Sequence, residues 1–467
     1  MPLLAEVAAS PLSPNTLLLI AFGTIAGLIL AIARFKCNGI VALVLASMVL
    51  GLLAQMEPIK VAESFTTGVA NTLGGLAMII GLGTILAKLL AESGAAHVIA
   101  ERLVALFGKN RLDYAIMVAA LVIGVSVFFQ VGILLLGPIV FALARETKTP
   151  VLRLGLPLAA GMSTAHGLIP PHPGPLAAIN IINANIGKTI AWSLLVVGPP
   201  VALLTGPLLA RWVVPRVPVP IGGLGEEAVA EPSAPRRPGF GISLFTMLLP
   251  VLLMLIATGC DIAWQAKDFG PGTMQATLRT WADFFGHPTV AMLIAVLVSF
   301  WTFGKDCGLG AAQIQKFADA ALAPMAGLLL IIAAGGGFSR VLNDSGVAHS
   351  IADVGRSMHL SPLLLAWLVA GMIRVSVGSA TVSVTTAAGI MLPVVQADPH
   401  VNRELLVLAM GAGSLILSHV NDSGFWLVKE YFGMDIPQTL KTWTVVETGI
   451  AIFSILLILT ANALFPT

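Results

Sequence analysis

The feature that most constrains this chain is a cluster of prolines inside a stretch without charge. His166–Pro175 contains four prolines in ten residues, and it lies within Leu154–Gly187, which has no Asp, Glu, Lys or Arg. Each proline lacks the N–H of a helix interior, and its ring clashes with the preceding turn. At membrane depth a broken helix must pack in protein or line a wet cavity, because unpaired carbonyls in hydrocarbon are costly. We expect a broken span over 154–187; the alternative is a surface loop, for which the apolar flanks are too short.

Composition supports a membrane setting for the whole chain. Its 467 residues are 57% hydrophobic and 10% charged, whereas soluble domains carry about 25% charged residues. Several apolar runs approach the length of about 20 residues needed to cross hydrocarbon. We expect an all-α polytopic membrane protein with ordinary spans at 17–33, 40–54, 69–90, 190–212, 243–259, 289–303, 324–342 and 442–464.

Net charge and cysteine spacing argue against several classes of function. The net charge of +2 is spread over connections and gives no reason to expect nucleic-acid binding. Cys37, Cys260 and Cys307 are far apart and form no CxxC motif, so we expect no disulfide, metal site or cofactor. The first fourteen residues show no cleavable signal pattern, so the first span is expected to direct insertion.

The chain is expected to consist of two repeats. Met78–Ala100 matches Leu330–Ala352 at an offset of 252 residues, and Val125–Val127 matches Val375–Val377 at 250. The expected divisions are a first repeat, 1–214, with a re-entrant hairpin at 114–144; a cytoplasmic linker, 215–240; and a second repeat, 241–467, with a hairpin at 361–396 and a broken span at 403–432. For 114–144 a single long tilted span is the alternative.

Five full spans and one hairpin in each repeat would give the repeats opposite orientations in the membrane. With the amino terminus outside, fifteen Lys and Arg residues fall on cytoplasmic connections and six fall outside, as the positive-inside rule expects. Inverted repeats with broken helices at the midplane are typical of alternating-access transporters.

The second hairpin combines a cation with many hydroxyl groups. Arg374–Thr386 holds six Ser or Thr residues in thirteen positions. Free N–H groups at the start of a returning helix, together with hydroxyls, form an anion site, so Arg374, Gly378, Ser379 and Thr381 are candidate ligands. The alternatives are helix–helix hydrogen bonds for the hydroxyls, and for Arg374 an internal acid partner or snorkelling to the interface.

The interrupted spans supply further candidates. Asp422 is the only acid between Glu404 and Glu430, so it is a candidate proton carrier or, alternatively, a partner for Arg374 or a helix cap. Its neighbours Asn421 and Ser423 can hydrogen-bond a polyol. His166 and His172 can relay protons or tie up freed carbonyls, and His166 is also a candidate substrate ligand. His419 is a further proton-coupling candidate. In the first hairpin, Ser126 and Gln130 complete the proposed ligand set.

Taken together, these stretches resemble the gluconate:proton symporter family, within the ion transporter superfamily. The resemblance is carried by His166–Pro175, Gly378–Val382 and Ser418–Trp426. It implies uptake of gluconate or a related sugar acid with a proton, and some similar permeases carry D-serine or glycerate. The superfamily implies a scaffold, a mobile domain with two hairpins and an elevator-like motion, and a homodimer in the lipid bilayer of the bacterial inner membrane.

This chain departs from the family pattern at a position that bears on proton coupling. Many relatives carry a carboxylate within Phe-Phe/Tyr-Glu-Val-Gly, where this chain has Gln130. If that carboxylate carries the proton in relatives, coupling here is altered or rests on Asp422 or a histidine. In relatives Gln is also frequent near position 377, where this chain has Val377.

Two other classes of function remain as alternatives. An intramembrane serine hydrolase would use Ser379 or Ser423 with His419 as base, which requires the nucleophile within hydrogen-bond reach of that base. A passive channel would not accumulate its substrate against a gradient. The repeated breaks favour the transporter over the hydrolase.

Overall fold

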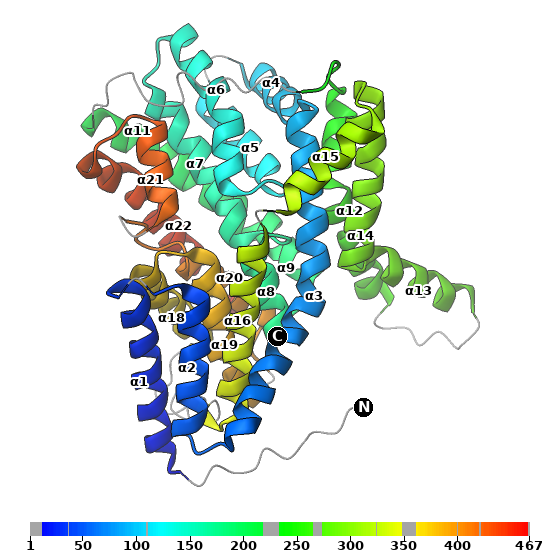
Figure 1. The fold of residues 1–467 in the computed structure, drawn as a ribbon. Coiled ribbons are helices and arrows are strands. Elements are labelled where there is room, and N and C mark those ends of the chain that lie inside the picture. The colour runs from blue at the N-terminus through cyan, green and yellow to red at the C-terminus, as the bar shows by residue number, and fades with distance from the viewer. Residues whose placement is uncertain are drawn as a thin grey trace.

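The protein is described by a computed structural model (Figure 1) in which the regular elements are helices. It describes residues 12–35, 37–108, 111–217, 233–264, 273–323, 325–347, 361–398, 400–419 and 422–465. Eight of the described helical stretches are long and apolar enough to cross a membrane. The expected all-helical membrane architecture is confirmed, and most of the predicted linker lies outside the described residues.

The first half of the chain folds into a long sequence of helices with short connections. Its helices are α1 (Pro14–Ala33), α2 (Gly39–Leu53), α3 (Pro58–Glu92), α4 (Ala95–Phe107), α5 (Leu112–Gly124), α6 (Phe129–Thr147), α7 (Val151–Leu168), α8 (Pro173–Ile182), α9 (Ile186–Trp192), α10 (Gly198–Leu203) and α11 (Leu209–Val213). Two π-helical segments join α9 to α10 and α10 to α11, so that Ile186–Arg216 forms one continuous span.

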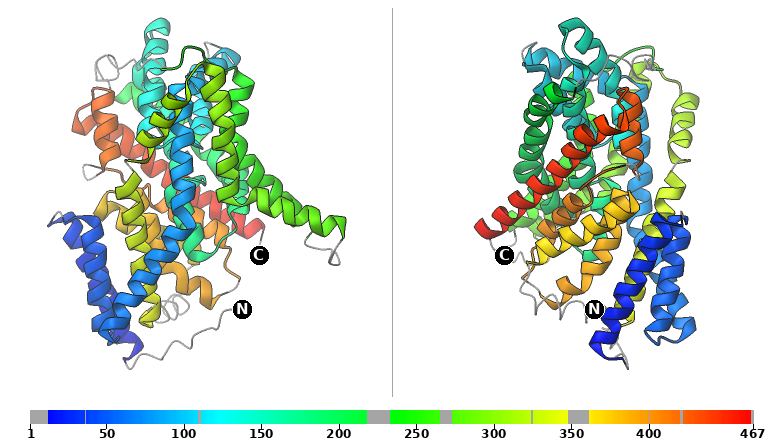
Figure 2. Two further views of the ribbon diagram at one scale, coloured as in Figure 1. Left: turned by 45° about the vertical axis from the view of Figure 1, so that its right-hand side comes forward. Right: turned by 90° about the vertical axis from the view of Figure 1, so that its left-hand side faces the viewer.

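The described parts of the second half of the chain are also built from successive helices. Its helices are α12 (Phe240–Trp264), α13 (Met274–Gly286), α14 (Pro288–Ser299), α15 (Ala311–Leu322), α16 (Met325–Asp344), α18 (Pro362–Val377), α19 (Ala380–Ala397), α20 (Arg403–Gly413), α21 (Ser423–Tyr431) and α22 (Ile436–Leu464). Helix α13 extends sideways from α12 and α14 (Figure 1), whereas α22 runs obliquely across the molecule (Figure 2).

Local sequence signals explain where several helices begin. Asn38 caps α2 by accepting from Ile40 N at 2.9 Å, and Asp435 forms a reciprocal capping box with Gln438 at the start of α22. Pro58 begins α3, where its missing N–H needs no partner. The sequence predicted this span only from Val69, so the polar residues before it are helical rather than a loop.

Four interruptions place helix ends inside the molecule. They separate α5 from α6, α7 from α8, α18 from α19, and α20 from α21. Helix α7 continues through His166 and ends at Leu168, so the break comes at the first two prolines of the decapeptide rather than at its start. Each interruption falls inside a segment where the sequence predicts a hairpin or a broken span.

Equivalent pairs of helices pack together in the two halves. Helix α5 packs on α7 and α18 packs on α20, which are corresponding elements at the repeat offset. Arg153 and Arg211 both pair with Asp113, at 3.4 and 3.0 Å, so the three parts of the chain that carry these residues lie together. The inversion of the repeats and the domain boundaries stay predictions.

Helices α3 and α16 meet through glycines. A Cβ on Gly68 of α3 would lie 2.5 Å from the carbonyl oxygen of Gly336 on α16, and one on Gly336 would lie 1.9 Å from Thr72 Oγ1. Only glycine permits this backbone approach. The first half is therefore held against the second at a tight crossing next to the interrupted helices.

Candidate functional site

A cavity of about 370 Å³ lies where the interrupted helices meet. It is lined by most of the residues singled out from the sequence: Gln130, His166, Arg374, Gly378, Ser379, Thr381, Asp422 and Ser423. These residues come from five helices and their caps in both halves of the chain. The structure thus brings together side chains that are up to about three hundred positions apart in sequence.

The centre of the polar wall is a buried ion pair between Arg374 and Asp422. Their side chains are 4% and 9% exposed, and Arg374 Nη2 donates to Asp422 Oδ2. Ser418 also donates to this carboxylate, and Gly424 N donates to Asp422 Oδ1 at 2.9 Å. Trp443 Nε1 in turn donates to Ser418 Oγ at 2.8 Å. Asp422 therefore has the contacts expected of an ion-pair partner and of the N-cap of α21.

Arg374 keeps hydrogen-bonding capacity for another partner. Its buried Nε makes no hydrogen bond to any of the described residues. A guanidinium carries five N–H donors in a planar fork and can hold two carboxylates at once. Arg374 also lines the cavity, so its charge can attract an anion there while it remains paired with Asp422.

Helix N-termini surround the same cavity. The cap or first turn of α6, α8, α19 and α21 contributes lining residues, among them Gln130, Pro173, Thr381 and Ser423. The first N–H groups of a helix have no intrahelical acceptor, and the helix dipole is positive at this end. The walls therefore favour an anion, in the way that half-helices of transporters bind substrate carboxylates.

Gly378 and Ser379 form the tip between α18 and α19. Gly378 adopts φ = 77°, a left-handed conformation that suits glycine at the end of a helix. Ser379 caps α19, and its Oγ accepts from Val382 N at 3.4 Å. This tight reversal places the start of α19 against the cavity beside Arg374.

Among the lining residues that sequence reasoning missed, three have polar side-chain groups: Ser163, Trp443 and Glu447. Glu447 on α22 is 1% exposed, and its Oε1 has no hydrogen-bond partner among the described residues. An ionisable residue inside a span is a functional candidate by default. Glu447 lies within the predicted span 442–464, so this rule applied to each acid in turn would have found it.

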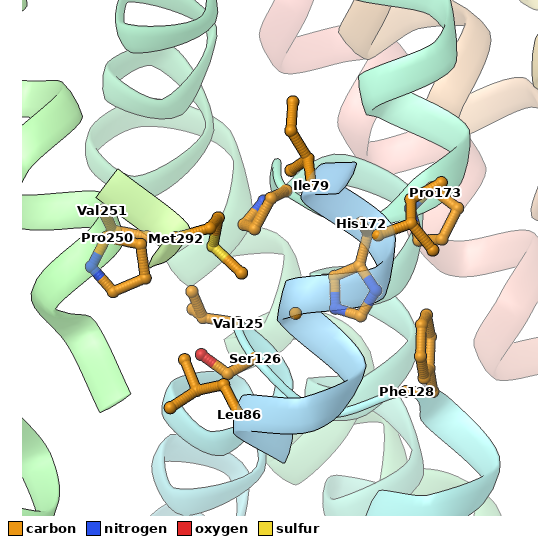
Figure 3. Close-up of a pocket in the computed structure, with 13 residues that line it drawn as sticks. Ile79, Leu86, Val125, Ser126, Phe128, His172, Pro173, Pro250, Val251 and Met292 are labelled. Atoms are coloured by element: carbon orange, nitrogen blue, oxygen red, sulfur yellow. The ribbon is translucent and has the colours of Figure 1, made fainter. Parts of the chain in front are cut away.

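Ser126 and His172 lie in a second, smaller cavity of about 30 Å³ (Figure 3). Ser126 Oγ donates to the carbonyl oxygen of Met247 on α12 at 3.1 Å. His172 Nε2 donates to the carbonyl oxygen of Gly124, at the end of α5. Ser126 was expected to line the same site as Gln130. It lies in the smaller cavity instead, because its hydroxyl donates to a backbone carbonyl of α12.

The three candidate histidines have different surroundings. His166 lines the main cavity, and its ring lies 5.2 Å from that of His172, edge to face. His419 lines neither cavity, and its Nε2 donates to Val375 O at 3.1 Å. Asn421 lies outside the described residues.

The hydrolase arrangement receives no support from these contacts. His419 donates to a backbone carbonyl, and Ser379 serves as a helix cap. Neither serine forms a hydrogen bond with His419 in the described part of the chain, although such a bond is the signature of an activated nucleophile.

Comparison with known proteins identifies the family. The model of the GntP family permease matches residues 15–464. The chain is 47% identical to a gluconate permease of Pseudomonas aeruginosa over 444 residues, covering 95% of this chain and 97% of the relative. It is 41% identical to the Gnt-II system L-idonate transporter of Escherichia coli, covering 96% and 99%.

A solved structure shares the fold. The YdaH transporter of Alcanivorax borkumensis superposes with a TM-score of 0.63 at 17% identity, covering 91% of this chain and 98% of that one. The agreement supports the fold, and the sequence relatives supply the family. This chain therefore belongs to the GntP family of permeases, multi-pass transport proteins of the bacterial inner membrane, and is not an enzyme.

Proposed function

We propose that this permease imports gluconate or a related sugar acid together with a proton. The observation that carries the proposal is the buried Arg374, which lines a cavity bounded by four helix N-termini. The cavity volume of about 370 Å³ falls in the range of about 300–1,000 Å³ that is usual for small-molecule sites. The relatives named gluconate permease and L-idonate transporter support a sugar acid.

The substrate carboxylate binds at the tip of the second hairpin in this proposal. Arg374 supplies the charge, and Gly378, Ser379 and Thr381 supply backbone N–H groups and hydroxyls at the start of α19. A carboxylate bound to a fixed cation and to N–H dipoles needs little reorganisation of the protein.

The hydroxyl groups of the sugar acid bind the opposite wall. Gln130 at the start of α6 and Ser423 at the start of α21 line the cavity with neutral groups that both donate and accept. Asn421 is a further candidate. Since a polyol offers several hydroxyls in a row, matched neutral partners select it over a short apolar acid.

Proton coupling involves a titratable group that shares the cavity with the substrate. Of the four candidates named from the sequence, Asp422 and His166 line it, and His172 contacts His166.

The two interrupted pairs, α5–α6 and α18–α19, move together past a scaffold in an elevator-like motion, and the protein acts as a homodimer. Native mass spectrometry in detergent tests the dimer, which a solely monomeric species would contradict.

Uptake of labelled gluconate into proteoliposomes tests the proposed function. With an inward pH gradient we expect saturable accumulation above the equilibrium level, abolished by a protonophore. D-serine, glycerate and idonate serve as competitors that rank the substrates. Gluconate uptake that is unsaturable, or that only equilibrates, would contradict active transport and would favour a passive channel.

A further inference from the structure

Glu447 is a carboxylic acid that no role assigned so far uses. It lies on α22, is 1% exposed and lines the cavity that holds Arg374 and Asp422. The hydroxyl of Ser163 on α7 lies within hydrogen-bonding reach of its carboxyl group, yet Oε1 has no partner among the described residues. The large majority of buried polar side-chain atoms have a hydrogen-bond partner, so a buried carboxyl oxygen without one calls for an explanation.

The charges that face Glu447 are few. From the elements around the cavity these are Arg374 on α18 and Asp422 at the cap of α21, and His166 on α7 is the other titratable group in the lining. Arg374 Nη2 is held by Asp422, while Arg374 Nε is without a partner in the described part of the chain. Among the described lining residues, Arg374 is therefore the cation that can compensate both the Glu447 carboxylate and an anionic substrate.

We propose that Glu447 carries the proton that accompanies the substrate, an inference that rests on the proposed proton-coupled import. In the empty cavity the charge of Arg374 compensates ionised Glu447. An entering substrate carboxylate binds Arg374 and neutralises that charge, which leaves Glu447 as an uncompensated buried charge. The Glu447 carboxylate then binds one proton from the water that fills the open cavity, and no other bond changes. When the substrate leaves on the other side, Arg374 is freed and the proton is released.

Asp422 is less suited to this task. Its carboxylate is engaged by Arg374, Ser418 and the N–H of Gly424. Protonation of Asp422 would break this ion pair and weaken the cap of α21, whereas protonation of Glu447 breaks no contact of its Oε1. The geometry thus separates a fixed ion pair from a carboxyl that is free to titrate.

Two assays on the E447Q variant test the inference. Exchange of internal for external gluconate moves no net proton, so we expect exchange rates within about twofold of wild type, because the neutral amide mimics the protonated acid. Accumulation driven by a pH gradient should fall to the equilibrium level, and gluconate entry should no longer alkalinise the external medium. E447D, which keeps the carboxyl, should recover part of the accumulation. E430Q, which alters an exposed acid outside the cavity, is the matched control and should behave as wild type.

The outcomes separate the two proposals. Accumulation by E447Q at the wild-type level would overturn the role of Glu447, and so would loss of exchange in both E447Q and E447D, because a binding or structural role would then suffice. If wild type exchanges another sugar acid but not gluconate, only the substrate assignment fails, and that acid replaces gluconate in the same assays. Absence of exchange and accumulation for every acid would overturn both proposals.

Discussion

The buried guanidinium of Arg374 holds the carboxylate of Asp422, which lies 48 residues later in the chain. His172 contacts the carbonyl oxygen of Gly124 across the same separation of 48 residues. Gly124 and His172 precede Arg374 and Asp422 by the offset that aligns Val125 with Val375. Contacts at equivalent positions thus join a hairpin tip to a broken span in both halves, but only the contact in the second half is an ion pair. This asymmetry supports the proposal that the anion site lies in the second half of the chain.

Removal of one partner of this ion pair should destabilise the protein strongly. R374A leaves Asp422 buried without a counter-charge, which typically costs about 3–5 kcal/mol, and it removes the proposed anion ligand. Thermal unfolding in detergent, with and without gluconate, measures both effects. R340A is the control, because its pair with Asp344 is half exposed and such pairs contribute about 0–1 kcal/mol.

A double variant separates folding from binding at the same pair. R374M/D422N removes both charges, and the Asn side chain still caps α21. We expect much of the lost thermal stability to return, while gluconate no longer raises the melting temperature. A ligand-induced shift that persists in the double variant would show that the substrate carboxylate binds elsewhere.

The cap at Ser379 should contribute both to stability and to affinity. S379A removes the side-chain acceptor for Val382 N, which typically costs about 1 kcal/mol, and takes a hydroxyl from the cavity. We expect a raised KM for uptake, and S379T should restore the cap. S383A on the same helix is the control, because its hydroxyl bonds Ser379 O at 2.7 Å outside the cavity lining. Equal KM values for S379A and S383A would exclude Ser379 as a ligand.

The glycine crossing between α3 and α16 should not tolerate a methyl group. In G336A the new Cβ would lie 1.9 Å from Thr72 Oγ1, and overpacking of this kind typically costs about 1–3 kcal/mol. On α3, G74A meets nothing within 4 Å, and should be neutral or more stable by about 0.5–1 kcal/mol. The melting temperatures of the two variants measure the difference, and the same change in both would contradict the close approach.

Acidification should destabilise the end of the protein that contains α4. Burial lowers the pKa of His97 by penalising its charged form, and Arg237 adds to the effect. The unfolded chain therefore binds a proton at His97 before the folded chain does, so stability falls as the pH drops below about 6.5 towards the folded pKa. H97Q should lose less thermal stability than wild type over this range. If H97Q keeps the wild-type dependence, His97 is not responsible.

The sequence was informative where backbone chemistry decides the structure. Prolines predicted the break between α7 and α8, because a missing N–H acts regardless of tertiary context. The isolated charges Arg374 and Asp422 were identified as candidates because buried ions must pair, and pairing between them was among the alternatives. Thr381 and Ser423 also line the cavity with them.

Sequence reasoning was less successful where packing between distant helices decides. Ser126 donates to α12, which no local pattern indicates. Whether the Glu447 side chain reaches the cavity depends on how α22 packs against α7 and α20. Its place in the cavity is therefore visible only in the three-dimensional structure. Helix α3 begins eleven residues before the expected Val69, because a proline start outweighs the polar composition of its first turns.

A structure of the protein with gluconate bound tests the central claim most directly. The account predicts the substrate carboxylate in the cavity of about 370 Å³, bonded to Arg374 and to the N-terminal N–H groups of α19. Its hydroxyls should face Gln130 and Ser423. Gluconate bound elsewhere, with Arg374 engaged only by Asp422, would contradict the account.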